Sequence, residues 1–144
     1  MNNRQLVLTL LAAANGRAFT PVQLQKSAFL VCENLADVFD ENAGFAFEPY
    51  DYGPFDAQVY AEARQLRSEG NAYMAPSDSG RWCTYAATPA GIEEGERLLN
   101  DEQPETAAYI RSVVDWVLQQ DFATLVRTIY EHYPQMRARS VFRG

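Results

Sequence analysis

The chain has 144 residues, 47% of them hydrophobic, which is enough for one domain with a single core. Its net charge of −7 disfavours nonspecific binding to DNA, which depends on Lys and Arg displacing counterions. The apolar runs fall far short of the roughly 20 residues that span a bilayer, and the N-terminus lacks a signal-peptide pattern. We therefore expect a cytoplasmic protein that does not contact membranes.

The first part of the chain predicts two helices. Apolar residues recur at helical spacing over 3–14 and stop at Asn15-Gly16. A second helix begins after Thr20, since Pro21 fits the first helical position and Gln23 can close a capping box. Its predicted apolar stripe consists of Leu24, Ala28, Val31, Leu35 and Val38.

An aromatic segment follows the second helix. Residues 44–49 could form a short strand, and residues 50–55 form a predicted compact turn. A third helix is predicted over 55–69, with Gly70 as its C-terminal cap. Its expected inner stripe is Phe55, Val59, Ala63 and Leu66.

Residues 72–87 predict a β-hairpin, because turn formers separate two short runs of β-forming residues. Thr88 and Pro89 then open a fourth helix. Three helices, a hairpin and a closing helix follow one another in the order of a winged helix, with the hairpin as the wing. We therefore predict an α+β, mostly α fold whose winged-helix-like core spans residues 1–100.

Residues 101–144 predict a helical extension packed on this core within a single domain. A polar linker over 100–103 precedes a fifth helix that starts at Pro104, and Asp121 caps a sixth helix. The apolar stripes of these two helices exceed what a winged helix needs. A homodimer through residues 104–133 is therefore possible.

The sequence indicates no catalytic, cofactor or metal site. Cys32 and Cys83 are too far apart in sequence for a redox pair or zinc motif, and we expect both to be buried. The only histidine, His132, would have to build a zinc site or a catalytic dyad alone. We expect the only lysine, Lys26, to tie the second helix to the aromatic turn rather than to catalyse a reaction. An acidic cluster comprises Asp37, Asp40 and Glu41, which we interpret as a solvated helix end rather than a cation site.

The aromatic turn is the main candidate for a partner-binding surface. Its rings could fill the core, or some could be exposed and anchor a partner protein, and the two readings are compatible. On the third helix, Arg64 and Arg67 share one face, which keeps DNA readout open despite the low charge of that helix. The candidate partner-binding residues are Tyr50, Tyr52, Pro54, Phe55, Arg64 and Arg67.

Three sequence pieces carry a family resemblance: Leu24-Gln25-Lys26, Tyr52-Gly53-Pro54-Phe55, and Ile129-Tyr130 with Tyr133-Pro134. In this order along a winged-helix pattern, over about residues 20–135, they resemble the YwgA-like proteins and the related Panacea antitoxin-like domains. The resemblance implies a non-enzymatic bacterial or phage protein. Panacea-type members are antitoxins that neutralise a partner toxin by binding it.

Two functions follow as hypotheses. The first is a protein-interaction module, antitoxin-like or otherwise regulatory, whose acidic surface suits a basic partner such as a toxin. The alternative is a DNA-binding transcriptional regulator that acts as a dimer.

Overall fold

The computed structural model describes residues 1–40 and 44–144, and its fold is α+β with helices predominating. The helices are α1 (Asn3–Ala13), α2 (Pro21–Asn34), α3 (Ala57–Ser68), α4 (Pro89–Asp101), α5 (Pro104–Gln119) and α6 (Phe122–His132). Short 3₁₀ turns are η1 (Ala36–Val38) and η2 (Pro134–Arg137). Two antiparallel hairpins pair β1 (Glu48–Tyr50) with β2 (Gly53–Phe55), and β3 (Ala72–Pro76) with β4 (Cys83–Ala87).

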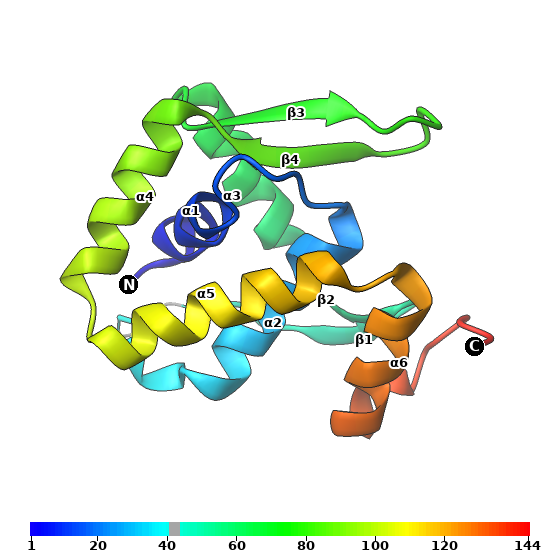
Figure 1. Cartoon of the computed structure of the whole chain (residues 1–144). Coiled ribbons are helices and arrows are strands. Elements are labelled where there is room, and N and C mark those ends of the chain that lie inside the picture. Colours follow the sequence, from blue (N-terminus) through cyan, green and yellow to red (C-terminus); the bar gives the residue numbers. More distant parts are fainter. Residues whose placement is uncertain (41–43) are drawn as a thin grey trace.

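Helix α1 runs through the centre of the molecule, where α3, α4 and α5 surround it (Figure 1). Its side chains from Leu6 to Ala13 are buried on all sides, because nearly all of them are apolar. Gly95 lets α4 approach closely, since a Cβ there would lie 2.3 Å from the Ala12 Cβ and 2.9 Å from the Leu8 carbonyl oxygen. The α1–α4 contact is therefore a backbone-to-backbone packing that only a glycine permits.

Helix α2 begins as predicted and ends earlier. The backbone N–H of Gln23 donates to the Thr20 hydroxyl at 3.2 Å, and Thr20 N–H donates to the Gln23 side chain at 2.9 Å. The prediction that the helix continues to Val38 is wrong, because α2 stops at Asn34 and turns into η1. A tertiary contact holds the turn that follows, since the Met1 ammonium donates to the Val38 carbonyl oxygen at 2.8 Å.

The predicted aromatic turn is a hairpin, and Phe55 belongs to β2 rather than to the third helix. Asp56 caps α3 by accepting from the Gln58 N–H at 2.9 Å. From α2, the Gln25 side chain accepts from Asp56 N–H at 3.1 Å and donates to the Asp56 carbonyl at 2.8 Å. This paired contact fixes the junction between hairpin and helix, which local propensity did not reveal.

The β3–β4 hairpin projects beyond the helices (Figure 1). Its strands pair from Ala72 with Ala87 to Pro76 with Cys83, and Phe19, between α1 and α2, forms a bridge to Tyr85. Because Cys83 lies at the far end of β4, its thiol is exposed, which corrects the expectation that it is buried.

The C-terminal helices continue the same core. The buried stripe of α5 is Ile110, Val113, Val114 and Val117, and that of α6 is Leu125, Val126, Ile129 and Tyr130. The predicted polar linker is shorter than expected, because α4 extends to Asp101. Among the described residues, no helix has both the length and the apolarity needed to cross a membrane.

Candidate functional site

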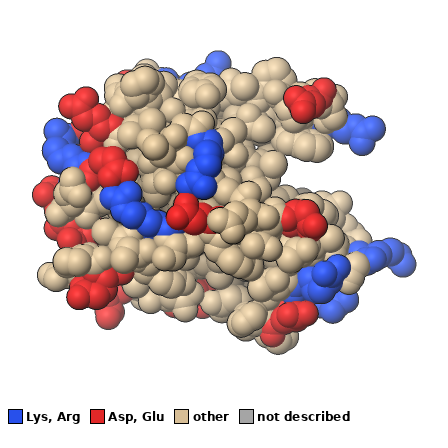
Figure 2. All heavy atoms as spheres, in the orientation of Figure 1, with Lys and Arg blue, Asp and Glu red and all other residues tan. Residues whose placement is uncertain are grey.

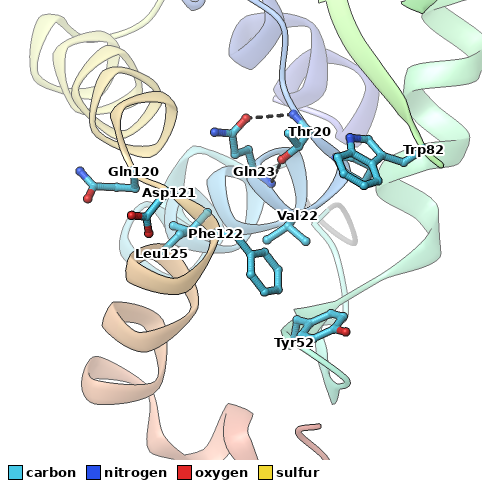
Figure 3. A pocket seen from close by; sticks show the side chains of 10 residues that line it. Thr20, Val22, Gln23, Tyr52, Trp82, Gln120, Asp121, Phe122 and Leu125 are labelled. Atoms are coloured by element: carbon cyan, nitrogen blue, oxygen red, sulfur yellow. Dashed lines mark hydrogen bonds between the residues drawn. The ribbon is translucent and has the colours of Figure 1, made fainter. Parts of the chain in front are cut away.

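A groove of about 680 Å³ lies between the β3–β4 hairpin and the N-terminal ends of α2 and α6 (Figure 3). We call it the aromatic groove, lined by Thr20, Pro21, Val22, Gln23, Tyr52, Trp82, Gln120, Asp121, Phe122 and Leu125. In Figure 2 the surface is hollowed on the right, between the hairpin and the body of the molecule, where most atoms belong to uncharged residues. The groove is therefore open and predominantly apolar.

Three aromatic side chains from separate parts of the chain converge on this groove. Trp82 and Phe122 are each 45% exposed, and Tyr52 is 41% exposed. The rings of Tyr52 and Phe122 meet edge to face, with centroids 5.0 Å apart. Large apolar side chains concentrated at one hollow mark an interaction site more strongly than the same residues scattered singly.

Local caps determine where these rings stand. The Asp121 carboxylate accepts from the Thr124 N–H at 2.7 Å, so Phe122 becomes the first residue of α6. That turn extends past the core, which leaves the Phe122 ring in the groove rather than on the buried stripe of α6. Trp82 stands immediately before β4 at the end of the hairpin. The helical periodicity of α6 includes Phe122, but it predicts a packed position for this ring and not a place at the groove.

The residues predicted in the aromatic turn divide into exposed and supporting ones. Tyr50 and Tyr52 are exposed, Phe55 is half-buried and Pro54 is buried. Tyr50 stacks on Phe55 with a centroid distance of 5.0 Å, outside the aromatic groove. Of this set, Tyr52 alone lines the groove.

Lys26 lies beneath the same hairpin. The side chain is 3% exposed, and Nζ donates a long hydrogen bond of 3.4 Å to the Pro54 carbonyl oxygen. It does tie α2 to the hairpin, but its burial was not predicted. Desolvation lowers its pKa from 10.5 to about 7. Gly53, with φ +108°, closes over this ammonium, since a Cβ there would lie 3.5 Å from Nζ.

The other candidates lie away from the groove. Arg64 and Arg67 are exposed on α3, and neither lines the aromatic groove. His132 is exposed, with Nδ1 3.0 Å from the Thr128 carbonyl oxygen. In the predicted acidic cluster, Asp37 is exposed, Asp40 binds the Met1 ammonium at 2.9 Å, and Glu41 lies outside the described residues.

Comparison with known proteins gave no assignment: neither a family model nor a curated protein matches this sequence. The likeness to the YwgA-like and Panacea antitoxin-like proteins therefore stays a prediction. The geometry of the groove carries the functional argument.

Proposed function

We propose that this chain is a non-enzymatic, winged-helix-like module that binds a partner protein in the aromatic groove. The observation that carries the proposal is the convergence of Tyr52, Trp82 and Phe122, each 41–45% exposed, on one apolar hollow. Aromatic side chains are enriched among the residues that dominate binding at protein interfaces, and burying these three would supply such anchors.

Two features support the winged-helix-like assignment. The order of α1, α2, α3, the β3–β4 hairpin and α4 is that of a winged helix, and the Phe19–Tyr85 bridge adds a third, one-residue strand beside the wing. Two features are additions to that plan. The β1–β2 hairpin separates α2 from α3, and α5 contributes to the central core.

The polar groups at the groove favour a protein partner over a small polar ligand. The Thr20 and Gln23 side chains are used in the α2 capping box, and the Asp121 carboxylate caps α6. Small-molecule sites usually combine apolar walls with a few polar groups aimed at the ligand. Here the polar side chains of Thr20, Gln23 and Asp121 serve the helix ends, and the large side chains left at the surface of the groove are mainly aromatic.

An antitoxin-like or other regulatory role is part of this proposal. Figure 2 shows acidic side chains at the left, on the side of α4 and the first half of α5. These helices and the turn between them carry Glu93, Glu94, Glu96, Asp101, Glu102 and Glu105, of which Glu94 and Glu96 pair with Arg97 and Arg111. That end of the molecule would steer a partner with a basic surface, such as a toxin. The aromatic groove, on a separate surface, would then hold one segment of that partner.

Site-specific photocrosslinking tests the proposal. A photoreactive phenylalanine analogue replaces Trp82 or Phe122 in the full chain, and Tyr73, equally exposed on β3, serves as the matched control position. We expect one protein to crosslink from both groove positions and not from the control. The purified pair should then bind in solution, at least about tenfold more weakly after Trp82→Ala with Phe122→Ala. A crosslinked protein whose affinity is unchanged by that double substitution would contradict the proposal.

The alternative of a DNA-binding regulator has one observation in its favour. Arg64 and Arg67 are exposed on α3, and neither forms an ion pair with a described residue. A gel shift with the DNA upstream of its own gene, at low salt, decides between the two roles. A sequence-specific complex that Arg64→Ala with Arg67→Ala abolishes would establish the regulator.

A further inference from the structure

One end of this acidic protein is basic. From residue 122 onward the chain carries Glu131 as its only acidic residue. The same segment carries four exposed arginines, which we call the arginine end: Arg127, Arg137, Arg139 and Arg143. None of them forms an ion pair within 1–40 and 44–144. Figure 2 shows the corresponding basic patch at the lower right, around α6 and the C-terminal segment. Their charges therefore face solvent without a carboxylate partner among the described residues.

The arginine end is held in place rather than trailing from the fold. Arg137 lies over the Tyr130 ring at 5.6 Å, and Arg139 lies over the Tyr50 ring at 5.9 Å. The segment between them and the C-terminus is attached to the β1–β2 turn, since Val141 N–H donates to the Asp51 carbonyl at 2.9 Å. The Tyr130 hydroxyl also donates to the Ser140 hydroxyl at 2.6 Å. Two of the guanidinium groups therefore rest on aromatic rings of the folded body.

A row of rings connects the arginine end to the aromatic groove. Phe122 in the groove packs against Phe142 with centroids 6.0 Å apart, and Phe142 packs against Tyr130 at 6.2 Å. Phe142, Arg127 and Arg137 also line a second hollow of about 330 Å³. A peptide that leaves the groove across Phe122 therefore meets guanidinium groups next. An apolar site followed by unpaired arginines is complementary to an apolar anchor followed by carboxylates.

We propose that the aromatic groove takes a segment of the partner protein in which an aromatic or aliphatic anchor is followed by acidic residues. The anchor packs among Tyr52, Trp82 and Phe122, and the carboxylates face the arginine end. This inference rests on the proposed function and specifies its ligand. A nucleic acid would use the same arginines, but it would also meet the repulsion of a chain with net charge −7.

Peptide selection tests the inference directly. The purified full chain is used to select from a random 12-residue peptide library on phage at physiological salt. We expect enriched peptides to carry an aromatic or aliphatic residue next to two or more Asp or Glu. A selected peptide, labelled and measured by fluorescence anisotropy, should bind at least about fivefold more weakly to Arg137→Glu with Arg139→Glu. The matched control is Arg64→Glu with Arg67→Glu, which changes the charge equally on α3 and should leave the affinity unchanged.

Because Arg137 and Arg139 also stack on tyrosine rings, a second pair keeps the test independent of folding. Arg127 and Arg143 make no cation–π contact within 1–40 and 44–144. The variant Arg127→Glu with Arg143→Glu should therefore also bind the selected peptide more weakly than the wild-type chain does.

Selected peptides whose binding depends on Trp82 and Phe122 but that show no preference for acidic residues would overturn this inference and leave the proposed function standing. The absence of any peptide that depends on Trp82 and Phe122 would overturn both. Labelled dT20 that binds more tightly than the peptides, through these arginines, would assign the surface to single-stranded nucleic acid.

Discussion

At the scale of single residues, Lys26 is the most unusual group in the protein. An ammonium in an apolar setting with one long hydrogen bond destabilises the folded state, and this is why its pKa falls to about 7. In the unfolded chain the same group has its ordinary value of 10.5. Unfolding therefore takes up a proton between these two pH values.

We expect the free energy of unfolding to rise as the pH increases from 7 toward 10, because the unfolded state binds more protons in that window. Below pH 7 both states are protonated, and the full cost of burying the charge remains. Lys26→Met should remove most of the rise and stabilise the protein at pH 6 by roughly 2–4 kcal/mol. Urea unfolding at pH 6, 7, 8 and 9 measures both effects. If the free energy of unfolding rose equally steeply with pH in the wild-type and Lys26→Met proteins, Lys26 would not be the titrating group.

Gly95 is a second residue whose identity is fixed by its surroundings. A methyl group there would overlap the Ala12 side chain and the α1 backbone, so Gly95→Ala should destabilise the fold by about 2–4 kcal/mol despite its better helix propensity. Thermal unfolding checks this, with Asn100→Ala at an exposed position of the same helix as the control. A stabilised Gly95→Ala protein would contradict the close α1–α4 packing.

At the scale of elements, the sequence predicts best what is local. The caps at Thr20, Thr88 and Asp121 each use a side chain and an N–H three residues apart, and all three are found. The β1–β2 hairpin was missed because its junction with α3 depends on Gln25, a residue 31 positions before Asp56.

The aromatic groove shows the same limit more clearly. Tyr52, Trp82 and Phe122 come from segments about thirty to forty residues apart, and each stands beside a turn or helix end, where periodicity does not show whether a side chain is buried. The density of aromatic residues in the turn marked it as unusual, and Tyr52 was therefore among the predicted partner-binding residues. The other two rings join it only through the way α6 and the β3–β4 hairpin pack onto α2.

At the scale of the whole molecule, the C-terminal helices bear on assembly. The apolar stripes of α5 and α6 that suggested a dimer face are buried within the protomer. What remains exposed along residues 104–133 as a large apolar group is Phe122.

We therefore expect any dimer through residues 104–133 to depend on Phe122. Sedimentation velocity at about 5 and 200 µM compares the wild-type chain with Phe122→Ala, and Val141→Ala serves as a control because Val141 is also exposed. The Phe122→Ala chain should be monomeric at both concentrations. A dimer through α5 and α6 that survives this substitution would contradict this dependence and place the interface elsewhere, such as at the half-buried Tyr109 and Trp116.

The exposed end of the β3–β4 hairpin has a practical consequence. Cys83 follows Trp82 directly and its thiol is exposed, whereas burial raises the pKa of the half-buried Cys32 to about 11. Because thiolates are the reactive form, a maleimide dye at pH 7 should couple to Cys83 far faster than to Cys32. Mass spectrometry of the labelled chain checks this, and Cys83→Ser should abolish the rapid coupling. The protein thus carries its own attachment point for a fluorophore beside the groove, where the dye's emission would report whether the groove is occupied.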